Sequence, residues 1–88
     1  MSSRREQQLV EGLKNLFYGV QKSQQIYKEL SKWQKKAIRM EEKEVEKAAK
    51  KIAATVEKWV VEKETNGDAP APGDVKKRIA KELEEFAE

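Results

Sequence analysis

The chain has 88 residues, of which 40% are charged, and it contains no cysteine and no histidine. Disulfides, thiolate metal sites and catalysis through a histidine base are therefore excluded. The length allows one small domain at most, with a thin hydrophobic core.

Helices are expected throughout. No alternating run of β-branched and aromatic residues indicates a strand. No glycine or proline occurs between Gly19 and Gly67, and the 47 residues between them are rich in helix-forming residues. As one helix they would be about 70 Å long. The predicted fold class is all-α: a small helical bundle built on one long central helix and completed by dimerisation.

The first predicted helix covers residues 5–18 and follows a disordered arm at residues 1–4. Ser3 and Glu6 have the spacing of a capping box. Gly12 and Gly19 allow two interpretations. Either Gly19 ends the helix and Gly12 is tolerated, or a second helix closely approaches the smooth side that they share. Apolar residues repeat at steps of three and four, which predicts one buried face: Leu9, Val10, Leu13, Leu16, Phe17 and Val20.

The predicted central helix covers residues 22–65, with Ser23 as its N-cap. Its apolar positions form two stripes, and the direction of the apolar face changes near residues 38–44. We favour a continuous helix because this junction has no turn residue; the alternative is a bend or a break into a hairpin near residue 40. The first stripe contains Ile26, Leu30, Trp33, Ala37 and Met40. The second begins at Ile38 and continues through Val45, Ala48, Ile52, Val56 and Trp59.

The second stripe supplies the argument for self-association. We expect the first stripe to pack on residues 13–20 of the same chain. One chain then has little left to cover the second stripe, which would meet its copy in a homodimer or the last helix. Val45, Ala48, Ile52, Val56 and Trp59 are the predicted dimer or partner interface.

The C-terminal part consists of a connector and a last helix. Gly67 is expected to end the central helix, and residues 66–73 contain both prolines of the chain. Asp74 is the predicted N-cap of a helix over residues 75–87. Because its charges oppose the helix dipole, this helix needs to dock through its apolar stripe: Val75, Ile79, Leu83 and Phe86.

The charge distribution gives the main indication of function. Residues 1–40 contain nine Lys or Arg and only three Glu, a balance of +6, whereas the rest of the chain has a balance of −3. Cations at one-turn intervals are able to follow a phosphate backbone. The competing interpretation is the ordinary polar face of an amphipathic helix. The candidate nucleic-acid-binding residues are Lys28, Lys32, Lys35, Lys36, Arg39 and Lys43, with Arg4 and Arg5 on the arm.

The resulting hypothesis is a small non-enzymatic accessory or regulatory protein that binds nucleic acid non-specifically through phosphate contacts. The alternative is a protein-binding adaptor or inhibitor that uses an exposed apolar stripe. We expect no catalytic residue, cofactor or small-molecule substrate. We also expect no metal, because the pairs Glu41–Glu44 and Glu82–Glu85 lie among lysines as in a charge-paired surface. No apolar run is long enough to span a membrane, so we expect a cytoplasmic protein without a membrane partner.

Overall fold

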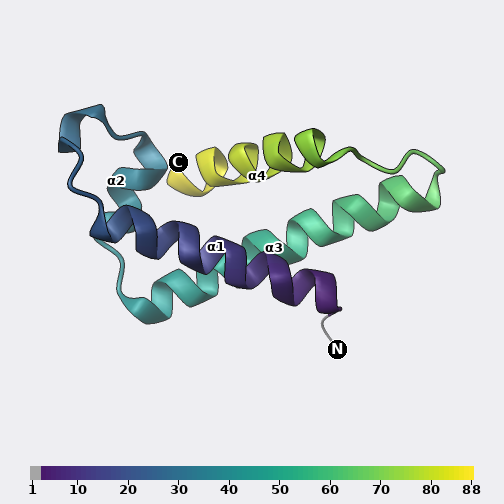
Figure 1. The fold of residues 1–88 in the computed structure, drawn as a ribbon. Helices are drawn as coiled ribbons and strands as arrows, with labels where there is room; N and C mark the ends of the chain where they lie inside the picture. The colour runs from purple at the N-terminus through teal and green to yellow at the C-terminus, as the bar shows by residue number, and fades with distance from the viewer. Residues whose placement is uncertain (1–2) are drawn as a thin grey trace.

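The computed structural model describes residues 3–88, which form four α-helices and one short 3-10 helix (Figure 1). Within these residues no strand is present, and the body measures 43 × 26 × 20 Å. The prediction of an all-α bundle built on one long helix is confirmed. The elements are α1 (Arg4–Lys22), η1 (Tyr27–Glu29), α2 (Lys32–Ile38), α3 (Glu42–Thr65) and α4 (Pro72–Ala87).

Helix α1 begins as the sequence predicts and ends later than expected. The Ser3 hydroxyl accepts a hydrogen bond from the Glu6 N–H at 3.0 Å, which caps the first turn. Residues 1–2 of the predicted arm lie outside the described residues, and Arg4 is already helical. Gly19 does not end the helix, which continues to Lys22. Nothing lies within 4 Å of a Cβ built on Gly12 or Gly19, so no second helix approaches this side either.

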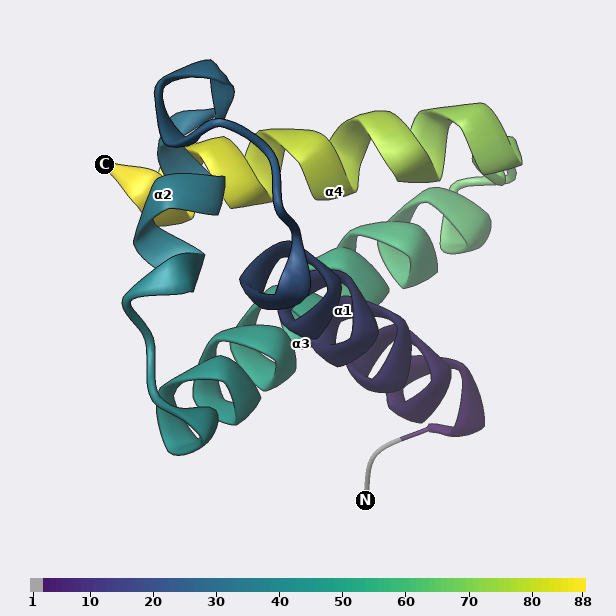
Figure 2. The ribbon, with the colours of Figure 1, turned by 60° about the vertical axis from the view of Figure 1, so that its left-hand side comes forward.

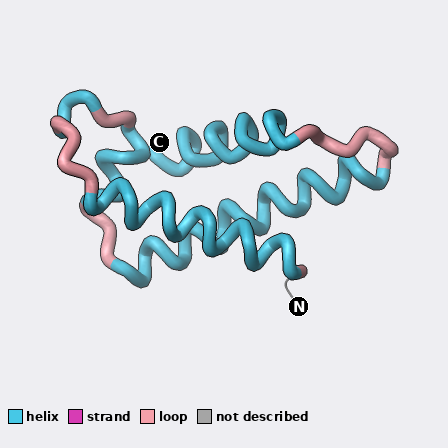
Figure 3. The backbone as a smooth tube through the Cα atoms, in the orientation of Figure 1, coloured by secondary structure: helices cyan, strands magenta, loops and turns pink. Residues whose placement is uncertain are grey.

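The prediction of one helix over residues 22–65 is wrong. The longest helix is α3, with 24 residues, and α2 is a separate helix of seven (Figure 3). Ser23 is the C-cap of α1 rather than the N-cap of a central helix, and its hydroxyl accepts a hydrogen bond from the Gln25 N–H at 3.2 Å. A helix of about 70 Å would leave its apolar stripes in water. Burial of those stripes overrides the helical preference of residues 23–31.

The second break, at residues 39–41, is stabilised by a side chain from α1. The Gln21 side-chain amide donates hydrogen bonds to the carbonyl oxygens of Ala37 and Met40, at 2.9 and 3.0 Å. The Met40 carbonyl has no backbone partner at the end of α2, and the Ala37 carbonyl gains a second donor beside the Met40 N–H. On the other side of the break, the Glu41 N–H donates to the Glu44 carboxylate at 3.4 Å. The junction therefore needs no glycine or proline.

The core lies where α1 crosses α3, as both ribbon views show (Figures 1 and 2). Phe17 of α1 is fully buried, and Trp33 of α2 and Phe86 of α4 pack against it with centroid separations of 5.8 and 5.6 Å. Ile26 and Leu16, which were expected in this core, are 57% and 41% exposed. The other buried apolar residues are Leu13, Val20, Leu30, Ala37, Val45, Ala49, Ile52, Ala53, Val56, Val60 and Leu83.

The predicted dimer stripe is mostly buried inside one chain. Val45 and Val56 are completely buried and Ile52 is 5% exposed, while Ala48 and Trp59 pack at the margin of the same core. The last helix covers part of this stripe, which is the second of the two arrangements considered above. A homodimer stays a prediction, but the argument from an uncovered stripe no longer supports it.

The end of α3 agrees with the sequence, and the start of α4 differs slightly. Gly67 has φ +75°, a conformation that glycine adopts without strain, and the Asp68 N–H donates to the Lys63 carbonyl at 2.9 Å. Helix α4 begins at Pro72, with Ala71 as N-cap, because proline fits the first helical position. Asp74 lies inside the first turn, where its carboxylate accepts a hydrogen bond from the Ala71 N–H at 3.3 Å.

The two glycines of α1 yield the first testable prediction. Because both are helical and a Cβ would meet open space, Gly12→Ala and Gly19→Ala should each stabilise the fold by up to about 1 kcal/mol. Urea unfolding followed by circular dichroism measures this. A loss of stability in either variant would show that a packing partner covers this side of α1.

The side-chain amide of Gln21 yields the second testable prediction. Gln21→Ala leaves the Met40 carbonyl without a donor and the Ala37 carbonyl with only its backbone donors, so the free energy of unfolding should fall by about 1–2 kcal/mol. Gln24→Ala is the matched control, since Gln24 is exposed and makes no side-chain hydrogen bond within residues 3–88. Equal losses in the two variants would contradict the role assigned to Gln21.

Candidate nucleic-acid-binding surface

Helix α2 presents its cations outward because its apolar residues are held by two other helices. Ala37 is completely buried, and Trp33 meets Phe17 edge to face. Ser31 is the N-cap of α2, and its N–H donates a hydrogen bond to the Gln34 side chain at 2.9 Å. Because Ala37 and Trp33 are turned toward the core, the lysines of α2 and Arg39 lie on the side away from α1.

A basic depression forms on this outer side, with a volume of about 460 Å³. Tyr27 lies beside it, with Lys35 Nζ 5.4 Å from the centre of its ring and the Arg39 guanidinium at 6.0 Å. Arg39 also donates a hydrogen bond to the Tyr27 hydroxyl. One carboxylate, that of Glu44, faces four cations. The lining residues are Tyr27, Lys32, Lys35, Lys36, Arg39, Met40, Glu44 and Ala87. We call this set the α2 basic depression.

The predicted row of cations along one straight helix is wrong, but its central members do come together. Lys32, Lys35, Lys36 and Arg39 line the α2 basic depression. Lys28 lies on η1 and Lys43 in the first turn of α3. The break at residues 39–41 separates Lys43 from the rest, so the surface is a patch rather than a linear track.

Lys36 has a structural contact that sequence reasoning missed. Its ammonium group donates a hydrogen bond to the Phe86 carbonyl at 2.8 Å and lies 4.2 Å from the centre of the Phe86 ring. The carbonyl belongs to the last turn of α4, where a cation interacts favourably with the helix dipole. No local pattern could indicate this contact, because the two residues are 50 positions apart. Lys36 is therefore partly committed to holding α4.

Arg4 and Arg5 do not form the predicted mobile arm. Arg4 begins α1, and Arg5 forms ion pairs with Glu57 at 2.8 Å and with Glu64 at 3.0 Å on α3. The hydrogen bonds that Arg5 donates to these carboxylates, first the one to Glu57, raise the pKa of Arg5, and the guanidinium lowers the pKa of Glu64. The start of α1 lies at the far end of that helix from α2 (Figure 1). Arg5 thus belongs to a clamp between α1 and α3 and lies outside the candidate surface.

The described part of the chain contains neither a cluster of metal ligands nor a membrane-spanning helix. No group of three or more carboxylate ligands comes together within residues 3–88. Glu82 of the second carboxylate pair is bound to Arg78 at 3.0 Å. None of the described helices has the length and apolar character needed to cross a membrane.

Comparisons with protein-family models, curated proteins and solved structures give no match for this chain. Function is therefore inferred from the geometry and charge of the protein's own surfaces.

The Arg5 clamp yields a prediction about pH. Arg5→Gln should lower the free energy of unfolding by up to about 1 kcal/mol, the value of an exposed ion pair, through loss of the bidentate contact with Glu57. Arg5 lowers the pKa of Glu64. The stabilisation from the Arg5–Glu64 ion pair is therefore complete above the usual glutamate pKa of 4.5, and it is lost as the pH falls through the lowered pKa of Glu64.

Unfolding curves at neutral pH and below pH 4 measure this difference between the wild type and Arg5→Gln. The difference should shrink in acid. An Arg4→Gln control, which removes the neighbouring exposed charge, should leave stability nearly unchanged at both values. A gap that stays constant with pH would contradict the clamp.

Proposed function

We propose that this protein binds nucleic acid non-specifically through phosphate contacts made by the α2 basic depression. One observation carries the proposal: four cations, three from α2 and one from its C-cap residue Arg39, converge on a depression that contains a single carboxylate. None of the ion pairs within residues 3–88 involves Lys32, Lys35, Lys36 or Arg39. Their charges are therefore not neutralised by the fold.

An ordinary polar helix face differs from this arrangement. Lysines on such a face alternate with glutamates, which pair with them at three and four residues. Lys14 illustrates that case, with Glu11, three residues before it, at 3.6 Å, and it also pairs with Glu46 of α3 at 3.6 Å. Helix α2 contains no acidic residue. An unpaired cluster of this kind attracts polyanions through the release of their counterions.

The proposed contacts divide into a central and a flanking group. Lys32, Lys35 and Arg39 are the central phosphate ligands. Lys36 contributes its charge while its ammonium group contacts the last turn of α4. Lys28 and Lys43 extend the surface on either side. These are phosphate contacts without base-specific readout, since lysine ammonium groups act as point charges. The Tyr27 hydroxyl holds Arg39 in place at the margin.

Binding to duplex DNA at increasing salt tests the proposal. With about four phosphate contacts, log K should fall with log salt with a slope near −3.6, an affinity loss of about 150-fold from 50 to 200 mM. The variant Lys32→Gln/Lys35→Gln/Arg39→Gln should make the slope shallower by about 2.7. Lys36 is left intact in this variant because it also stabilises α4.

The matched control is Lys58→Gln/Lys76→Gln/Lys81→Gln, which removes three exposed lysines that do not line the depression. It has the same net charge as the test variant and should bind nearly as well as the wild type. Equal weakening in the two variants would mean that net charge alone attracts DNA. No binding by the wild type at low salt would overturn the proposal outright.

A further inference from the structure

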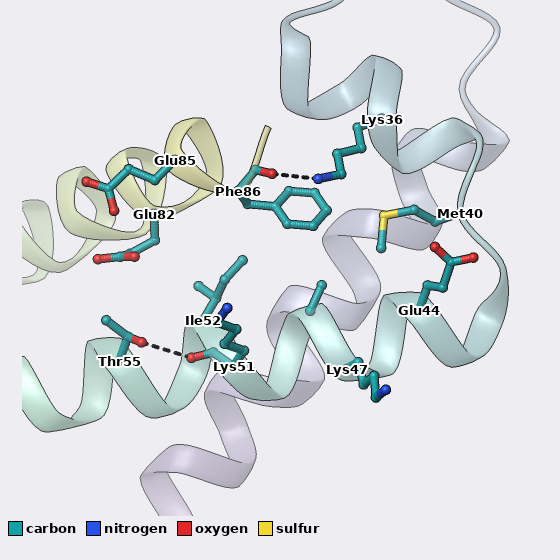
Figure 4. Close-up of a pocket in the computed structure, with 11 residues that line it drawn as sticks. Lys36, Met40, Glu44, Lys47, Lys51, Ile52, Thr55, Glu82, Glu85 and Phe86 are labelled. Carbon is teal, nitrogen blue, oxygen red and sulfur yellow. Dashed lines mark hydrogen bonds between the residues drawn. The ribbon is translucent and has the colours of Figure 1, made fainter. Parts of the chain in front are cut away.

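A second concave surface lies between α3 and α4 and shares Lys36, Met40 and Glu44 with the α2 basic depression (Figure 4). This α3–α4 groove has a volume of about 680 Å³. Its floor consists of Met40, Ala48, Ile52 and Phe86, and α1 contributes no residue to its lining. The groove therefore lies on a side of α3 that α1 does not cover.

The shape of the groove fits a helix. The lining residues of α3 run from Glu44 to Thr55 at steps of three and one, which is one continuous helix face. These twelve residues of helix correspond to about 18 Å, or slightly more than three turns. Ala48 in the middle of the floor has a small side chain, so a second helix axis is able to approach closely. An occupant of about 12 helical residues would fill this length.

The two sides of the groove carry opposite charges. Lys47 and Lys51 are exposed on the α3 side, one turn apart, whereas Glu82 and Glu85 lie on the α4 side (Figure 4). Within residues 3–88 no ion pair joins the two sides. Arg78 pairs with Glu82, so Glu85 is the more available carboxylate. Lys47, Lys51 and Glu85 form no ion pair within residues 3–88, so their charges are available to an external group.

We propose that the α3–α4 groove binds an amphipathic helix of a partner protein. The apolar stripe of this partner helix packs on the floor of the groove. Acidic residues on one flank of the stripe face Lys47 and Lys51, and basic residues on the other flank face Glu85. Reversing the helix exchanges its two flanks, so a helix with one acidic and one basic flank docks in a single direction. This mode is helix-in-groove recognition, completed by charge complementarity at the rims.

Three synthetic helical peptides with the same Leu/Ala stripe test the proposal. One has an acidic and a basic flank, one has two acidic flanks, and one has two basic flanks. Fluorescence anisotropy should show that the wild type binds the mixed peptide about fivefold more tightly than either of the others, the factor expected for two exposed ion pairs. Lys47→Glu/Lys51→Glu, which makes both rims acidic, should instead prefer the peptide with two basic flanks.

Lys50→Glu/Lys76→Glu is the matched control, because it changes the net charge equally with two exposed lysines that lie outside the groove. It should keep the wild-type preference. Ala48→Phe, which fills the floor, should weaken binding of all three peptides at least tenfold, with circular dichroism confirming that the variant is folded.

Absence of binding, equal binding of the three peptides, or unchanged binding by Ala48→Phe would overturn the proposal. So would light scattering that finds a wild-type dimer abolished by Ala48→Phe. In that case a second copy of the chain, rather than a partner helix, occupies the groove.

Discussion

The arrangement of the helices depends on the burial of Phe17. This side chain is completely inaccessible to solvent and has edge-to-face contacts with Trp33 and Phe86. Each contact brings a different helix, α2 or α4, onto α1. Aromatic pairs of this geometry add to the stabilisation that burial alone provides. Because α2 has only seven residues, it is too short to be stable by itself and takes its position from this contact.

The position of α2 determines the electrostatic character of the molecule. With Trp33 and Ala37 directed into the core, the three lysines of this helix line the basic depression, and none of them forms an ion pair within residues 3–88. Arg5 shows the opposite outcome for a similar charge, since its two carboxylate partners on α3 already neutralise it. Formal charge along the chain is therefore a poor guide to which cations are available to a polyanion.

Lys36 connects the two candidate surfaces to the stability of α4. It lines both the α2 basic depression and the α3–α4 groove, and its ammonium group binds the last turn of α4. That turn carries Glu84 and Glu85, which are unfavourable near a helix C-terminus. A cation at the same place offsets this repulsion. Met40 and Glu44 also line both surfaces, so a ligand bound at one surface touches residues that shape the other.

Local patterns by themselves determined much of this protein. Ser3 and Glu6 indicated the start of α1, Gly67 indicated the end of α3, and the stripe Val75 to Phe86 indicated the face on which α4 docks. Each of these features depends on residues within a few positions of one another. The concentration of cations at residues 28–39 was equally visible, and all of these cations except Lys28 line the depression.

Only the tertiary structure decided where the central region breaks. Residues 23–31 and 39–41 contain no glycine or proline, and the packing of Phe17 and the hydrogen bonds of Gln21 act across 16 or more positions. A large separation in sequence also hid the contact of Lys36 with Phe86, 50 positions apart, and that of Arg5 with Glu57, 52 positions apart. Helical preference is a local property, whereas burial of an apolar stripe depends on what the rest of the chain brings to it. In a chain with so thin a core, burial of the stripes outweighed the local preference.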